Sequence, residues 1–238
     1  MNFMFRQILD QAAAVLVPPT CVLCGAPGKA GLDLCAACRD ELPRNRHACP
    51  RCALPLPPAV AANAWCGACL QRPPPYTDAF VPYLYRDRIR ALITGAKFSG
   101  RLNFLRLLGL CLADSAREAG ITRPGLILPV PLHPHRMRTR GYNQALEIAR
   151  VLGKELVIAV DGDTCVRLRA ITPQEGLEKE ARKRNVHGAF GVTAPLKAGH
   201  VALLDDVVTT GSTAVEVANT LLQAGARRVD LWAVARTP

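Results

Sequence analysis

The stretch Val201-Ala-Leu-Leu-Asp205-Asp206-Val-Val-Thr209-Thr210-Gly211-Ser212-Thr213 decides the fold of this chain. Residues 201–204 are apolar without alternation, which predicts a strand buried on both faces, as in a parallel sheet covered by helices. Asp205 and Asp206 follow at its carboxyl end, where open α/β sheets bind their ligands. Adjacent carboxylates readily accept the hydrogen bonds that neighbouring ribose hydroxyls donate. The stretch therefore predicts a ribose site at the end of a buried strand.

The residues after the two acids predict a phosphate-binding loop. The backbone N–H groups of Thr209, Thr210, Gly211, Ser212 and Thr213 can wrap an anion closely, and Gly211 permits a positive φ. Thr213 and Glu216 have the spacing of a capping box, which predicts a helix whose N-terminus adds to the site. An ordinary strand, turn and capped helix would explain each part alone, but the combination favours a phosphosugar site. The stretch resembles the signature of type I phosphoribosyltransferases, which bind phosphoribosyl pyrophosphate (PRPP).

Composition indicates a globular chain with anionic partners. The 238 residues suffice for one or two domains with their own cores, and half of them are hydrophobic. The net charge of +11 favours nucleotides, polyphosphates or nucleic acid without choosing among them. Aromatic residues make up only 5% of the chain, so few platforms are available to stack the bases of single-stranded DNA.

No apolar run approaches the ~20 residues of a membrane span, so no spanning segment is expected. Residues 1–17 predict a short amphipathic helix. Asp10 interrupts what would otherwise be the apolar core of a signal peptide. Packing of this helix onto its own protein is favoured over membrane binding.

Eight of the ten cysteines form four Cys-x-x-Cys pairs, which predict metal sites. The pairs are Cys21/Cys24, Cys35/Cys38, Cys49/Cys52 and Cys66/Cys69. Each pair places two thiolates on one tight turn, and two turns complete a tetrahedral site, so four turns supply two structural zinc sites. A thioredoxin-like redox motif predicts a single pair, and an iron–sulfur cluster is the other alternative. Sequential pairing makes two successive zinc ribbons, and interleaved pairing stays open.

Pro73-Pro74-Pro75 predicts a stiff break after the last cysteine pair. We therefore expect residues 1–75 to form an N-terminal helix and a small double zinc ribbon, and residues 76–238 to form an α/β domain with a parallel sheet flanked by helices. Strands are predicted over residues 79–85, 126–130, 156–160, 164–168, 200–207 and 229–234, and helices over residues 87–97, 102–119, 142–152 and 212–224.

Two further segments predict contacts with a diphosphate. A sharp turn at Val130, Pro131 and Leu132 follows a predicted strand, and Arg138 and Arg140 come next, where arginine forks suit phosphate oxygens. The second segment is polar and irregular over residues 169–190, and its positive charges could close over bound diphosphate as a lid. The candidate lid residues are Arg169, Gln174, Arg182 and Arg184. Solvent-facing basic loops are the alternative for both segments.

Together these pieces resemble the ComF/GntX family of competence-related proteins over almost the whole chain. The resemblance rests on the four cysteine pairs, Lys97-Phe98-Ser99-Gly100-Arg101, Val130-Pro131-Leu132, Arg140-Gly141-Tyr142-Asn143-Gln144, Arg169…Gln174…Leu177, Arg182…Arg184-Asn185 and Asp205 to Thr213. It implies a double zinc ribbon and a type I phosphoribosyltransferase domain in a bacterial cytoplasmic protein tied to uptake or use of external DNA. One departure is Ile171, where the family often has threonine.

Two functions follow as hypotheses. In the first, PRPP with Mg²⁺ binds across the strand ends, its ribose on Asp205 and Asp206 and its 5′-phosphate on Thr209 to Thr213, and an acceptor displaces pyrophosphate. Catalysis would then rest on positioning and charge stabilisation, without a single catalytic acid or base. In the second, the PRPP site is regulatory, and the ribbons and basic surface contact single-stranded DNA and the DNA-uptake machinery.

Overall fold

The computed structural model describes residues 19–29, 31–168 and 188–238. The chain divides into two compact units, Met1–Pro43 and Arg44–Pro238. The second of these units holds the third and fourth cysteine pairs together with the whole sheet. The domain boundary expected near residue 75 stays a prediction.

The first unit is built from short turns around its cysteines. Isolated bridges join Thr20 to Pro27 and Lys29 to Leu32. Helix α2 (Ala36–Asp40) begins directly after Cys35, whose sulfur accepts a hydrogen bond from the backbone N–H of Cys38. Within residues 19–29 and 31–43, the buried aliphatic side chains are Leu32, Leu34 and Leu42.

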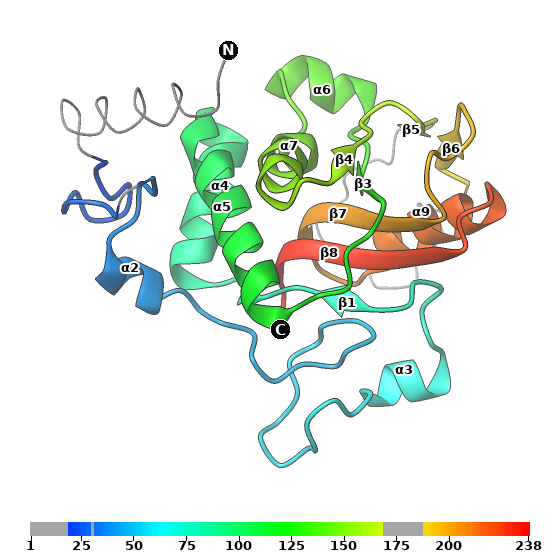
Figure 1. Ribbon diagram of the computed structural model, residues 1–238, viewed down its shortest axis with the longest axis horizontal. Coiled ribbons are helices and arrows are strands. Elements are labelled where there is room, and N and C mark those ends of the chain that lie inside the picture. Colours follow the sequence, from blue (N-terminus) through cyan, green and yellow to red (C-terminus); the bar gives the residue numbers. More distant parts are fainter. Residues whose placement is uncertain (1–18, 30, 169–187) are drawn as a thin grey trace. The chain divides into compact units, whose positions relative to one another are not determined.

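The second unit is organised by a parallel sheet with strand order β1-β8-β7-β3-β4, in which β2 also pairs with β8 (Figure 1). Every pairing in this sheet is parallel, which confirms the predicted α/β class. The strands are β1 (Ala79–Phe80), β2 (Tyr83–Leu84), β3 (Leu126–Pro129), β4 (Ala159–Val160), β7 (His200–Val208) and β8 (Arg228–Arg236). The two long strands, β7 and β8, lie at its centre.

Helices cover both faces of this sheet. Helix α9 (Ser212–Gln223) packs Val217 and Leu221 into the cluster that contains Val201 and Leu203 of β7. Side chains alternate along a strand, so Ala202 and Leu204 face the other way, where the remaining long helices pack (Figure 1). These are α4 (Asp87–Ser99), α5 (Leu102–Ala119) and α7 (Gln144–Leu156). Short helix α3 (Gly67–Gln71) follows Cys66.

A two-stranded antiparallel sheet stands apart from the main one. It pairs β5 (Cys165–Arg167) with β6 (Phe190–Val192). The sequence predicted β5 within residues 164–168 but not β6, which holds Gly191 and only three residues. This pair carries Arg167 and Phe190, which matter for the site below.

Three sequence predictions are wrong in detail. The capping box of Thr213 and Glu216 is absent, because α9 begins at Ser212 with Gly211 as its N-cap, and Glu216 instead accepts the N–H of Gly188 at 2.6 Å. No helix was predicted between Leu132 and residue 142, but the structure forms α6 (Pro134–Arg140) there. The strand predicted over residues 156–160 shortens to β4, because α7 continues to Leu156.

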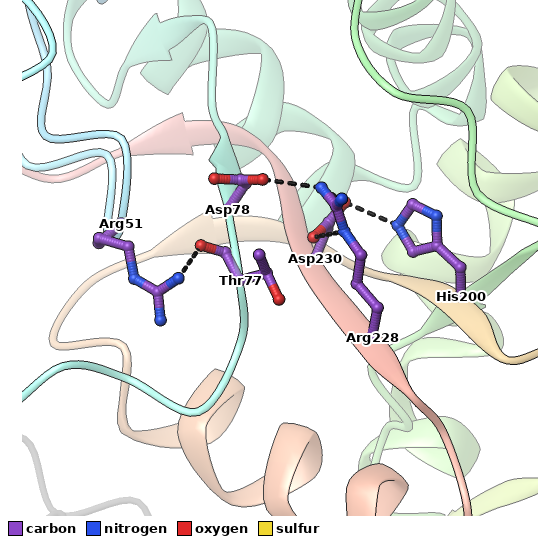
Figure 2. A network of polar contacts seen from close by, with 6 residues as sticks. All are labelled: Arg51, Thr77, Asp78, His200, Arg228 and Asp230. Carbon is purple, nitrogen blue, oxygen red and sulfur yellow. Dashed lines mark hydrogen bonds and ion pairs between the residues drawn. The ribbon is translucent and has the colours of Figure 1, made fainter.

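A network of ion pairs links residues at the amino ends of the central strands (Figure 2). Arg228 donates to Asp230 at 2.9 Å and to Asp78 at 2.7 Å. His200 Nε2 lies 2.7 Å from Asp230 Oδ2. The network joins β7, β8 and the residues leading into β1 at the end of the sheet opposite Asp205.

Within the described ranges, no helix is long and apolar enough to cross a membrane. The helix predicted over residues 1–17 lies outside the described residues, as do the lid residues Arg169, Gln174, Arg182 and Arg184.

Candidate functional site

An acidic pair lies at the carboxyl end of the central strand β7. Asp205 is partly exposed and Asp206 is buried. Lys97, from the last turn of α4, places its Nζ 2.6 Å from Asp206 Oδ2. Asp205 Oδ1 accepts the backbone N–H of Asp206 at 2.8 Å. Lys97 thus pairs with Asp206, and the remaining carboxylate oxygens can accept hydrogen bonds from a ligand with hydroxyl donors.

The environment of Asp205 favours its neutral form. Burial raises the pKa of Asp205, and the negative charge of Asp206 raises it further, while Lys97 opposes both. The resulting pKa is about 7. Two close carboxylates in a partly buried site resist double ionisation. Perturbed carboxyl groups of this kind are concentrated at functional sites.

The predicted phosphate loop follows directly. Gly211 has φ of 79°, in the left-handed region that its lack of a side chain permits. The first backbone hydrogen bond of α9 runs from the N–H of Val215 to the carbonyl oxygen of Gly211 and is 2.9 Å long. The N–H groups of Thr213 and Ala214 precede that bond in α9, where backbone donors have no intrahelical acceptor. The Thr210 and Ser212 hydroxyls lie 2.9 Å apart. The loop thus combines amides, hydroxyls and a helix N-terminus, which suits a phosphate.

Arg236, at the end of β8, donates hydrogen bonds to the backbone carbonyls where this loop begins. Its guanidinium donates to the carbonyl oxygens of Val208, at 3.1 Å, and Thr209. Arg236 is only 8% exposed. Burial lowers the pKa of Arg236, an effect that the cysteines of the second tetrad oppose, with Cys52 foremost. Sequence reasoning missed this residue, since its partners lie far from it along the chain.

The turn at Val130, Pro131 and Leu132 lies beside the acidic pair. Pro129 pairs with Leu204 in the sheet, so the turn begins next to Asp205. The N–H of Val130 donates to Leu204 C=O at 2.8 Å, and its carbonyl accepts Asn143 Nδ2 at 3.0 Å. Asn143 also caps α7 through Oδ1, at 3.0 Å from Ala145 N. The turn is therefore fixed from both sides by backbone and helix cap.

The structure places the two predicted arginines on α6. Arg138 is exposed, and Arg140 donates to Gln144 Oε1 at 2.9 Å. The neighbouring Tyr142 hydroxyl donates to the carbonyl oxygen of Ala96, one residue before Lys97. Arg140 thus joins the end of α6 to the start of α7, and Tyr142 joins the residues before α7 to α4.

A cationic group that the sequence did not single out lies within electrostatic range of Asp205. Arg167 of β5 stacks on Phe190, 5.5 Å from the ring centre. Burial lowers the pKa of Arg167, as does Arg136, while Asp205 raises it. Burial, followed by the positive charge of Arg167, lowers the pKa of His133. Arg167, Arg136 and His133 therefore share one electropositive environment next to Asp205, which suits an anionic ligand.

The structure answers the open question about the cysteine pairs. Cys21, Cys24, Cys35 and Cys38 form one tetrad, and Cys49, Cys52, Cys66 and Cys69 form the other. The pairing is therefore sequential, and each tetrad lies within one compact unit. Cys111 and Cys165 are buried residues outside both tetrads.

The geometry of both tetrads fits tetrahedral zinc. The four sulfur atoms of each set lie within 4.8 Å of one another. Cys24 and Cys35 sulfurs are 3.7 Å apart, and Cys52 and Cys66 sulfurs are 3.6 Å apart. Zinc–sulfur bonds of about 2.3 Å in a tetrahedron place sulfurs about 3.8 Å apart. Cys66 N–H donates to Cys49 Sγ at 3.3 Å, as amides around thiolate sites do. Four protein ligands leave no open position, so the sites are structural.

Sequence comparisons agree with this arrangement. Residues 12–70 match the family model of the double zinc ribbon domain. The DNA utilization protein YhgH of Escherichia coli (strain K12) is 36% identical over 226 residues, covering 93% of this chain and 98% of that protein. The chain belongs to the ComF/GntX family. Competence protein F of Haemophilus influenzae is 30% identical over 212 residues, covering 85% of this chain and 90% of that protein.

Other matches are more distant. Competence protein ComFC of Bacillus subtilis is 23% identical over 200 residues, covering 81% of this chain and 79% of that protein. Among solved structures, a purine phosphoribosyltransferase from Pyrococcus horikoshii aligns with 56% of this chain and 83% of its own, at 21% identity and a TM-score of 0.31. The protein TT1426 from Thermus thermophilus aligns with the same shares at 20% identity and a TM-score of 0.33.

Proposed function

We propose that this ComF-family protein binds PRPP at the carboxyl end of β7 and transfers its phosphoribosyl group to an acceptor in the bacterial cytoplasm. The observation that carries the proposal is the continuity of Asp205, Asp206 and the loop to Thr213 on one strand end and one helix N-terminus. A ribose 5-phosphate needs hydroxyl acceptors and anion donors side by side. This segment supplies both within a few residues.

The ribose end of the site is formed by the acidic pair. In the proposed complex, Asp205 and Asp206 accept hydrogen bonds from the ribose 2′ and 3′ hydroxyls. Lys97, 2.6 Å from Asp206, limits repulsion between the two carboxylates. Because the pKa of Asp205 is raised by burial and by Asp206, a ligand that donates to the ionised carboxylate binds better as pH rises through about 7.

The two ends of PRPP carry phosphate groups, and the site has positive character at both ends. The loop from Thr209 to Thr213 holds the 5′-phosphate on its N–H groups, and the turn at Val130 to Leu132 faces the diphosphate. Arg167, Arg138 and the lid residues Arg169, Arg182 and Arg184 supply further positive charge. Charge developing on departing pyrophosphate is stabilised by fixed donors of this kind, with no proton transfer by a dedicated residue.

Mg²⁺ would neutralise the diphosphate and hold it in a reactive geometry when bound with PRPP. Carboxylate oxygens and substrate phosphates are its usual ligands, and Asp205 and Asp206 have that donor chemistry.

A calorimetric titration tests the proposal. Full-length protein is titrated with PRPP in Mg²⁺ buffer, beside an Asp205→Ala/Asp206→Ala variant and an Asp230→Asn control whose acidic group lies at the opposite end of the sheet. We expect binding by the wild type and control, and binding at least about tenfold weaker by the double variant. Equal affinity of all three proteins would reject the assigned site.

A second candidate function is contact with single-stranded DNA, with the PRPP site serving regulation. It is favoured by the net charge of +11 and by the name of the relative YhgH, a DNA utilization protein. It is also favoured by Trp65, which is 42% exposed and whose ring centre lies 5.2 Å from the guanidinium of Arg51. Fluorescence anisotropy of a labelled oligonucleotide across salt concentrations tests it with the full chain. Phosphate contacts predict affinity that falls steeply with salt, whereas a flat response rejects them.

A further inference from the structure

Arg236 joins two parts of the second unit that lie far apart in sequence. Its Nε donates to the carbonyl oxygen of Cys52 at 3.2 Å, and its Nη1 donates to the carbonyls of Val208, Thr209 and Thr237. Cys52 belongs to the second cysteine tetrad, and Val208 and Thr209 begin the phosphate loop. One buried guanidinium therefore contacts both the second metal site and the loop.

The direction of these bonds matters for anion binding. In a trans peptide the carbonyl and the following N–H point in opposite directions. Since the carbonyls of Val208 and Thr209 point at Arg236, the N–H groups of Thr209 and Thr210 point away from it. Arg236 thereby fixes two amides in the orientation that a phosphate on the open side of the loop requires.

Other contacts attach the second tetrad to the same region. Arg51, between two tetrad cysteines, donates to the carbonyls of Thr77 and, at 2.9 Å, Pro74 (Figure 2 shows the Thr77 contact). Tyr76 is 2% exposed, and its hydroxyl lies 3.7 Å from the position that a Cβ on Gly211 would take. The second tetrad is thus continuous with the core beneath the loop.

We infer that Arg236 is a positioning residue that couples metal occupancy of the second tetrad to the phosphate affinity of the loop. Metal fixes the turn that carries Cys52, and the carbonyl of Cys52 helps to hold the guanidinium against the loop. Four metal-bound thiolates also leave net negative charge near this buried cation, which stabilises it there. The identity of the ligand rests on the function proposed above, whereas the coupling itself does not.

Ligand affinity tests the coupling. The probe is ribose 5-phosphate, titrated calorimetrically into full-length protein. Arg236→Lys keeps the charge but cannot reach four carbonyls with one ammonium group, so we expect affinity about tenfold weaker. Arg228→Lys is the matched control, because it changes an arginine at the other end of the same strand. An equal loss of affinity in Arg236→Lys and Arg228→Lys, or no loss of affinity in either variant, would overturn the role of Arg236.

Metal dependence is tested with one variant in each tetrad. Cys69→Ser removes a ligand of the second site without changing Cys52, and Cys38→Ser makes the same change in the first site. Each variant is analysed for zinc content and titrated with ribose 5-phosphate. We expect about tenfold weaker binding only for Cys69→Ser. Equal affinity of a zinc-depleted Cys69→Ser protein and the wild type would overturn the coupling, and Arg236→Lys decides the matter if Cys69→Ser does not fold.

Amide hydrogen exchange at residues 209–212 gives a readout without ligand. We expect faster exchange in Arg236→Lys and Cys69→Ser than in Arg228→Lys and Cys38→Ser. Unchanged exchange would contradict the inference even if ribose 5-phosphate binds. Conversely, wild-type protein that binds no ribose 5-phosphate but shows the exchange pattern would reject the proposed function and retain the coupling.

Discussion

Lys97 Nζ and Asp206 Oδ2 lie 2.6 Å apart, and this ion pair is partly buried at the end of the central strand. Lys97→Met leaves two adjacent carboxylates without their neighbouring cation. We expect the free energy of unfolding at pH 8 to fall by about 1–3 kcal/mol, as measured by urea denaturation.

The double variant Lys97→Met/Asp206→Asn serves as the control for that loss. Removing one carboxylate relieves the repulsion, so the two substitutions together should cost less than Lys97→Met alone. Strict additivity of the two effects would show that the pair does not interact in solution.

Asp205 makes stability depend on pH. The pKa of Asp205 in the folded protein is raised to about 7, above its value in an unfolded chain. Its contribution to the free energy of unfolding is therefore fully present below pH 4 and is lost as pH rises through about 7. Asp205→Asn removes this penalty and should be more stable than the wild type at pH 8, by at least about 1 kcal/mol, since one pKa unit is worth about 1.4 kcal/mol. Thermal denaturation at pH 5 and pH 8 checks this expectation. A difference between the proteins that does not shrink at pH 5 contradicts the raised pKa.

Asn143 has two roles that can be separated by substitution. Asn143→Ala removes both the cap on Ala145 and the bond to Val130, and should cost about 2 kcal/mol in unfolding free energy. Asn143→Asp keeps the acceptor for the cap but loses the donor to Val130. We therefore expect Asn143→Asp to retain most of the stability and still to weaken pyrophosphate binding. Wild-type affinity in Asn143→Asp would exclude a role for the turn in ligand binding.

Metal content provides a test of the tetrads. Native mass spectrometry should find two zinc ions in each wild-type chain and one in Cys24→Ser or Cys66→Ser. Chelation at neutral pH should lower the melting temperature, because metal binding contributes to folding. Full stability in a metal-free chain would refute structural zinc.

Much of the fold was predictable where apolar residues follow a clear period. Residues 102–119 were predicted as a helix and match α5, and residues 200–207 agree closely with β7. Helix α6 escaped prediction because it has no buried residues and hence no apolar period. Strand β6 is too short and glycine-containing to be distinguished from a loop. The capping box failed because Gly211 takes the N-cap position with positive φ, so that α9 begins at Ser212, ahead of Thr213.

The candidate site was predictable only where its residues are neighbours in sequence. Asp205, Asp206 and the loop form one continuous segment, and the cysteine spacing predicted two four-cysteine sites but not which pairs combine in each. The ion pair of Lys97 with Asp206, the bonds from Arg236 to the carbonyls of Cys52, Val208 and Thr209, and the electrostatic influence of Asp205 on Arg167 join distant segments. No local pattern encodes such contacts.

Amide hydrogen exchange of full-length protein with and without PRPP and Mg²⁺ tests the central claim most directly, because it reports where the ligand binds. We predict that PRPP slows exchange in residues 205–213, with the largest effect between Thr209 and Ala214, and leaves the amino ends of β7 and β8 around His200 and Arg228 unchanged. Exchange in residues 205–213 that is the same with and without saturating PRPP would contradict the claim that this strand end and loop bind a phosphosugar.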